Sequence, residues 1–141
     1  MDERSLTIHR FNLDGSGLTR VLGELEAGIM EAVWQRGAAT VREICAALPS
    51  RSHYKTVMTV ANRLVDKELL VREATGHRPY VYRATVDRET FLARIAATVS
   101  SGLVGDFGRQ ALAQFVQAAD AIDPVYLDEL ERLVRERKEG R

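Results

Sequence analysis

The chain has 141 residues, of which 45% are hydrophobic and 28% are charged, and its formal net charge is zero. This composition is typical of an ordinary folded protein of one domain, or of one small domain with an appendage. No run of ~18 apolar residues is present, the start MDERSLTIHRF lacks the apolar stretch of a signal peptide, and one cysteine excludes a disulfide framework. We therefore expect a cytoplasmic protein without a membrane partner.

The charge is distributed unevenly along the chain. Residues 40–85 hold eight Lys or Arg against four Asp or Glu, whereas residues 1–39 and 86–141 are both mildly acidic. A basic middle between acidic flanks is a modest electrostatic footprint for a polyanion such as nucleic acid, although a solvated surface has the same appearance.

The first part of the chain is predicted to hold an arm and two helices. Residues 1–17 form the arm, and apolar residues then recur at three- and four-residue steps from Leu18, with Gly37 as the stop. TVRE (Thr40–Glu43) is a capping box, in which the Thr hydroxyl and the Glu carboxylate satisfy each other's backbone amides. It opens a short helix that ends at Pro49.

The middle is predicted to be a helix followed by a hairpin. Ser52 is a fair N-cap for a third helix through about Lys67, and strand-like residues 69–74 and 80–85 flank the turn TGHRP. Three further helices follow at about 87–101, 107–120 and 124–138. The fold class is therefore mainly α with a small β-hairpin: a winged helix-turn-helix domain over residues 18–86, then a helical region over residues 87–141.

The third helix has an unusual polar face. Its inward stripe consists of Val57, Val60, Ala61 and Leu64, and the opposite side carries Ser52, Lys55, Thr56, Thr59, Asn62, Arg63 and Asp66. The wet side of any amphipathic helix is the ordinary explanation. However, Thr and Asn are poor helix formers, and short polar side chains suit close approach to phosphates and base edges. Because the hairpin adds Arg72, Arg78 and Arg83, we favour contact with double-stranded DNA.

Several segments resemble the penicillinase-repressor family of BlaI/MecI/CopY-type winged-helix regulators. They are LGELE with Met30 and Trp34, TVREI, YKTVMTVANRLVDK and RPYVYR, and together they cover about residues 20–135 in order. The Lys-Thr-x-x-Thr…Arg-Leu pattern of the third helix is the most specific part.

The resemblance implies a bacterial dimeric repressor that binds a dyad-symmetric operator and blocks transcription. It carries over Lys55, Thr56, Thr59 and Arg63 to the recognition helix, and Arg78 with Tyr80 to the wing. With the polar neighbours added, the expected DNA-binding residues are Arg42, Ser52, Lys55, Thr56, Thr59, Asn62, Arg63, Arg78, Tyr80 and Arg83.

The chain departs from the family pattern at three points. Glu68 stands where members often have glycine after the recognition helix, so that helix must end without a glycine cap. The paired Cys-x-Cys motifs of the copper-responsive branch are missing. In the β-lactam branch a regulatory protease cuts an Asn-Phe bond, and the corresponding pair here is Gln114-Phe115, which we treat as a candidate cleavage site.

The C-terminal helices carry apolar stripes that a complete winged-helix domain would leave uncovered. A second copy of the chain would bury them, although burial within one chain is the simpler alternative. We therefore expect a homodimer whose interface includes Phe91, Ile95, Val99, Leu112, Phe115, Val116, Tyr126, Leu130 and Leu133.

No catalytic or cofactor site is expected. The carboxylate pairs Glu24/Glu26 and Glu129/Glu131 are two residues apart and point to different helix faces, so they form no general acid–base site. Three distant histidines and one cysteine make no convincing metal site. The competing function is a winged-helix module that binds a protein partner without specific DNA binding.

Overall fold

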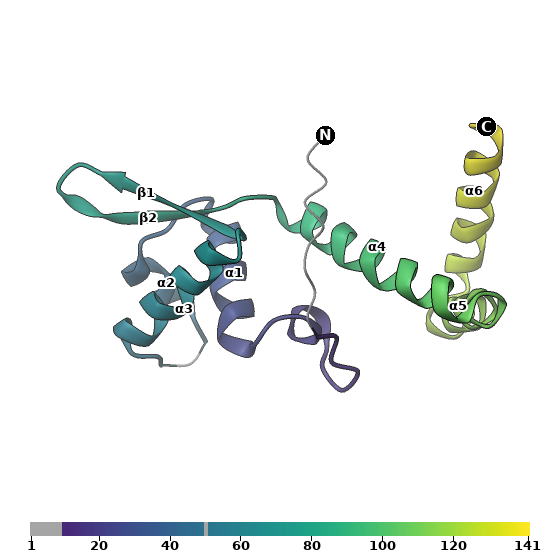
Figure 1. Ribbon diagram of the computed structural model, residues 1–141, viewed down its shortest axis with the longest axis horizontal. Coiled ribbons are helices and arrows are strands. Elements are labelled where there is room, and N and C mark those ends of the chain that lie inside the picture. The colour runs from purple at the N-terminus through teal and green to yellow at the C-terminus, as the bar shows by residue number, and fades with distance from the viewer. Residues whose placement is uncertain (1–9, 50) are drawn as a thin grey trace. The chain divides into compact units, whose positions relative to one another are not determined.

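The computed structural model describes residues 10–49 and 51–141, so most of the predicted arm lies outside the described residues. The chain forms two compact units, one up to Ile95 and one from Ala96 onward. In chain order the elements are a 3₁₀ helix Gly17–Arg20, α1 Glu24–Arg36, α2 Val41–Ala47, α3 Tyr54–Asp66, β1 Leu70–Thr75, β2 Arg78–Ala84, α4 Arg88–Phe107, α5 Arg109–Ile122 and α6 Val125–Glu139 (Figure 1).

The first helix begins later than the apolar spacing predicts. Leu18 lies in the 3₁₀ helix, and α1 starts only at Glu24. Gly23 is the N-cap, and its amide donates to Glu26 Oε1 at 3.0 Å, which supplies the start signal that the spacing of the leucines obscures. The predicted stop is confirmed, because Gly37 caps α1 with a φ of 80°.

Helices α2 and α3 form the predicted helix-turn-helix. The capping box of α2 is confirmed, since the Glu43 amide donates to Thr40 Oγ1 at 3.2 Å and the Thr40 amide donates to Glu43 Oε1 at 2.9 Å. The N-cap of α3 is His53, without a side-chain hydrogen bond, so the prediction of Ser52 was wrong by one position. The predicted inward stripe of α3 is buried in full.

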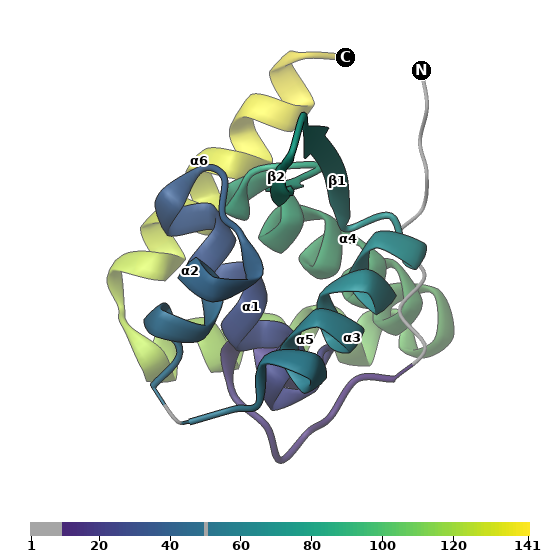
Figure 2. The ribbon, with the colours of Figure 1, turned by 90° about the vertical axis from the view of Figure 1, so that its left-hand side faces the viewer.

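The hairpin pairs in the antiparallel sense around a turn in which Gly76 has a φ of 68°. Helices α1, α2 and α3 lie together on one side of it (Figures 1 and 2). A bridge that the sequence did not predict adds a third extended segment, because Ala39 and Tyr82 exchange two backbone hydrogen bonds of 2.8 and 3.0 Å. The hairpin is thereby attached to the segment between α1 and α2, as the wing of a winged helix.

The core of the first unit reaches into the beginning of α4. Phe91 is buried, its ring centroid lies 5.5 Å from that of Trp34, and the Trp34 indole donates to the Val86 carbonyl at 2.9 Å. Ile95 packs partly buried against the same core. Phe91 therefore contributes to the folded monomer and offers no surface to a second chain. Its placement in the predicted dimer interface is not supported.

The second unit buries none of its side chains. Helix α5 packs against α6, yet no residue from 96 to 141 is buried. Large apolar side chains remain exposed along all three of its helical segments: Leu103, Val104, Phe107, Leu112, Phe115, Val116, Ile122, Val125, Tyr126, Leu133 and Val134. Among the helices of the described residues, none is long and apolar enough to cross a membrane.

Glu68 adopts a left-handed backbone conformation at the junction between α3 and β1. Its φ is 64°, and no other non-glycine residue in the described parts of the chain has a positive φ. This conformation costs a residue with a Cβ about 1–2 kcal/mol.

We expect Glu68→Gly to be more stable than Glu68→Ala by about 1 kcal/mol in urea unfolding, because both variants lose the side chain and only glycine relieves the backbone. Equal stability of the two variants would contradict strain at this position.

Candidate nucleic-acid interface

Helix α3 presents the polar face that its sequence predicts. Lys55, Thr56, Thr59 and Arg63 are exposed, while Ser52 and Asn62 are half-buried. The Thr59 hydroxyl donates to the Lys55 carbonyl one turn earlier, at 2.9 Å. Since its hydrogen is used within the helix, Thr59 can offer a partner an acceptor oxygen or its methyl group.

Two apolar side chains on the same helix were missed by the sequence analysis. Tyr54 and Met58 lie one turn apart on α3 and are 46% and 36% exposed. A major groove presents thymine methyl groups, which such side chains can contact. Met58 is about 100° from Val57, outside the inward stripe, and its spacing could have identified it; Tyr54 shares the angular position of the stripe, and only the structure shows that this first residue of α3 is exposed.

The basic side chains divide into paired and unpaired groups. Arg36, Lys67 and Arg83 pair with Glu43, Glu26 and Glu73 at 2.5, 2.6 and 3.3 Å. By contrast, five exposed basic residues make no ion pair with any residue of the described ranges 10–49 and 51–141. They are Arg42, Arg51, Lys55, Arg63 and Arg78. The cations of the second group have no ion-paired carboxylate in the described part of the chain that offsets their positive charge. Arg83, an expected DNA-binding residue, is instead shared with Glu73.

A hydrogen-bonded cluster joins α3 to the hairpin. Asn62 Oδ1 accepts from the Tyr82 hydroxyl at 2.8 Å and from Arg72 Nη1 at 3.1 Å. Arg72 and Tyr82 are partners in the register of β1 and β2, and the Arg72 guanidinium lies 4.4 Å from the centroid of the Tyr80 ring. Asn62 therefore connects α3 to the hairpin.

Burial raises the pKa of the Tyr82 hydroxyl above its usual value, so this group stays protonated and acts as a donor at neutral pH. Tyr82 and Arg72 were not among the expected site residues. The alternation of Tyr80 and Tyr82 along one strand, facing Arg72 on the other, is the signal that could have found them.

The remaining predicted wing residues are accessible. Arg78 begins β2 next to the turn, and Tyr80 is 48% exposed. Arg42 is exposed near the start of α2. The structure thus places the expected residues on α2, α3 and β2 of one compact unit, with Ser52 in the segment just before α3, and it engages Asn62 and Arg83 with protein partners.

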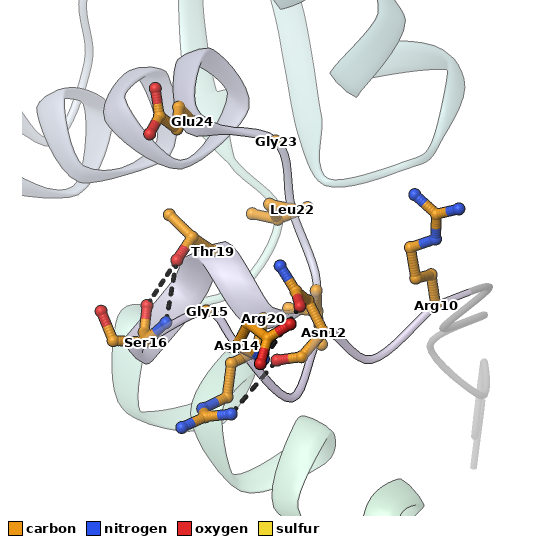
Figure 3. A pocket seen from close by; sticks show the side chains of 11 residues that line it. Arg10, Asn12, Asp14, Gly15, Ser16, Thr19, Arg20, Leu22, Gly23 and Glu24 are labelled. Atoms are coloured by element: carbon orange, nitrogen blue, oxygen red, sulfur yellow. Dashed lines mark hydrogen bonds between the residues drawn. The ribbon is translucent and has the colours of Figure 1, made fainter.

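A separate polar hollow lies between the turn before the 3₁₀ helix and the start of α1 (Figure 3). Its lining includes two arginines, Arg10 and Arg20, and two acids, Asp14 and Glu24. The Arg20 guanidinium donates to the carbonyls of residues 12 and 13 at 3.1 and 2.8 Å. Because the charges of this lining balance and Arg20 already has hydrogen-bond partners, the hollow favours neither an anionic nor a cationic ligand. Across the described ranges, no group of three or more His, Cys, Asp or Glu residues could hold a metal ion.

Comparison with known proteins identifies one family. A family profile described as penicillinase repressor matches residues 22–136. No curated protein matches the chain.

Three similar solved structures share 17–18% identity with the chain. The Bordetella bronchiseptica regulator BpsR, studied for regulation of its DNA binding by 6-hydroxynicotinic acid, is 17% identical with a TM-score of 0.44, over 82% of this chain and 76% of that one. A MarR family transcriptional regulator from Silicibacter pomeroyi is 18% identical with a TM-score of 0.44, over 74% and 72%. A chain of the Giardia lamblia Hop2-Mnd1 complex is 17% identical with a TM-score of 0.40, over 83% of this chain and 79% of that one.

Proposed function

The chain belongs to the penicillinase repressor family of transcription regulators, and from this premise we propose that it is a homodimeric bacterial repressor. Each protomer inserts α3 into a major groove of a dyad-symmetric operator, and the wing contacts the flanking backbone. The proposed activity is DNA binding in the cytoplasm, without catalysis.

The observation that carries this proposal is the exposed face of α3. Lys55 and Arg63 make no ion pair with described residues, and they flank threonines that can approach base edges. Threonine is a poor helix former, so helix propensity does not explain why threonines lie between these two cations on an exposed face. Arg and Lys with short hydroxyl side chains are the groups that bind phosphates and base edges.

The homodimer is supported by the exposed apolar side chains of the second unit. A segment of this size that buries none of its own side chains has no core of its own, and its apolar surface is stabilised by a partner. A second copy satisfies this need and brings two recognition helices to the two halves of a palindrome. The proposed interface comprises Leu112, Phe115, Val116, Tyr126, Leu130 and Leu133, with Ile95 and Val99 at its edge.

Release by proteolysis remains a separate proposal. Gln114 and Phe115 are exposed, but both lie inside α5, whereas proteases prefer exposed loop tips. Cleavage at this bond therefore requires α5 to open locally. We expect no cleavage of the free protein without a dedicated protease.

Selection of bound duplexes from random DNA tests the proposed function. We expect enrichment of a palindrome whose half-sites are spaced by about one helical turn, or by a multiple of it. Binding should weaken steeply with added salt, because phosphate contacts release counterions. No enrichment, together with a salt-insensitive protein interaction, would instead support the winged-helix module that binds a protein partner.

Arg78 is expected to act through a phosphate. Arg78→Ala should lower the affinity for specific and random duplex by similar factors, and should reduce the slope of log K against log[salt] by about 0.9 if one phosphate contact is lost. Fluorescence anisotropy over a salt series measures both quantities. An unchanged slope would remove Arg78 from the interface.

A further inference from the structure

We propose that Asn62 is a positioning residue that locks the wing onto α3, and that it does not recognise adenine through its carboxamide oxygen. The wing is the hairpin formed by β1 and β2. This inference rests on the proposed function, since it concerns how the DNA-binding surface is held together. The polar face of the helix, taken alone, predicts that Asn62 contacts DNA, and the proposal replaces that role.

The carboxamide oxygen of Asn62 has no capacity left for DNA. An amide oxygen offers two acceptor positions, and here Tyr82 and Arg72 occupy both, at 2.8 and 3.1 Å. Because a guanidinium can only donate, the atom that faces Arg72 must be the oxygen. An asparagine that recognises adenine needs this oxygen to accept from the adenine amino group. The bidentate recognition of adenine would therefore require the cluster to break.

Tyr82 makes the cluster a rigid joint. Its side chain is 1% exposed, and its backbone exchanges two hydrogen bonds with Ala39. The same residue therefore fixes the wing to the segment before α2 through its main chain and to α3 through its hydroxyl.

The joint also orients the exposed part of the wing. Arg72 is the cross-strand partner of Tyr82 and lies over the ring of Tyr80, at 4.4 Å from its centroid. Since Asn62 holds Arg72, the direction of both wing side chains is set from α3. A surface arranged before binding avoids the cost of ordering it in the complex.

A double-mutant cycle of Tyr82→Phe and Asn62→Ala tests the proposal. Each single variant should lose ~2- to 12-fold in affinity for the selected duplex, the range for one net hydrogen bond. The double variant should be hardly weaker than Asn62→Ala, because that variant has already lost the bond from the Tyr82 hydroxyl, whereas Tyr82→Phe alone keeps the bond between Asn62 and Arg72. Against operators with single base-pair changes, the loss should be uniform. Loss of preference at one base pair in Asn62→Ala alone, with wild-type affinity in Tyr82→Phe, would show that Asn62 reads a base.

Thr85→Val is the matched control. The Thr85 hydroxyl shares its hydrogen between the carbonyls of Glu68 and Leu69 at 2.8 and 3.2 Å, so this variant also removes one hydroxyl donor, here between the end of β2 and the junction of α3 with β1, outside the proposed interface. It should lower the stability measured in urea by an amount similar to Tyr82→Phe and leave DNA affinity unchanged. Equal affinity losses in both variants would reduce the Asn62 cluster to a purely structural role.

Hydrogen exchange of the wing amides provides a readout without DNA. Tyr82→Phe should accelerate exchange across residues 71–83, whereas Thr85→Val should affect only the base of the hairpin. If the wild-type protein binds no duplex, the proposed function is overturned. The hydrogen-exchange result would still show whether Asn62 and Tyr82 hold the wing on α3. Unchanged exchange in Tyr82→Phe would overturn the joint itself.

Discussion

Phe115→Asp is expected to convert the protein into a monomer that binds its operator about 10²–10⁴-fold more weakly, because the second half-site is then no longer bound as part of the same complex. Phe115 is 38% exposed on α5, within the apolar surface that the second unit leaves uncovered. A carboxylate there would lose its water in a dimer but keep it in a monomer. Leu133→Asp on α6, at a residue 48% exposed, should have the same effect.

Gln117→Asp controls for the added negative charge. Gln117 is exposed on the same helix, at an angular position away from Leu112, Phe115 and Val116. We expect it to remain dimeric and to bind DNA as the wild type does. Sedimentation velocity at micromolar concentration distinguishes the dimer from the 15.8 kDa monomer. A monomeric wild-type protein would end the dimer hypothesis. If Phe115→Asp and Gln117→Asp had the same oligomeric state and the same DNA affinity, Phe115 would not lie in the dimer interface.

Lys55→Ala and Arg63→Ala are expected to weaken operator binding by about 1–3 kcal/mol each, which is the cost of losing a good base contact. Both side chains are exposed and opposite the buried stripe of α3, so their truncation leaves no cavity. Neither leaves a carboxylate without its ion-pair partner among the described residues. Unfolding midpoints in urea should therefore stay at the wild-type value while DNA affinity falls.

Arg36→Ala is the charge-matched comparison. It also removes one positive charge, but from the end of α1, where Arg36 pairs with Glu43, and not from the polar face of α3, so no proposed base contact is lost. Fluorescence anisotropy at fixed salt should therefore rank Lys55→Ala and Arg63→Ala as the weaker binders, each with relaxed preference at one base pair. Wild-type affinity in either α3 variant would remove that residue from the interface.

The sequence by itself determined the local elements of this protein. The capping box at Thr40, the inward stripe of α3 and the hairpin depend on residues close together in the chain, and period and capping chemistry describe such neighbours well. The polar face of α3 was predictable for the same reason, because the residues opposite a buried stripe are known once the stripe is known. The start of α1 was misplaced because its leucines continue the helical spacing across the non-helical Gly23.

Only the tertiary structure decided which surfaces these elements meet. Periodicity marks the apolar side of α4 but does not say that Phe91 packs on Trp34 within the first unit. The bridge of Ala39 to Tyr82 and the sharing of Asn62 by Tyr82 and Arg72 join residues at least ten positions apart. Such contacts arise when the folded chain brings distant groups to hydrogen-bonding distance, and no local pattern encodes that distance. The polar face of α3 is therefore a property of its sequence, whereas its attachment to the wing is a property of the fold.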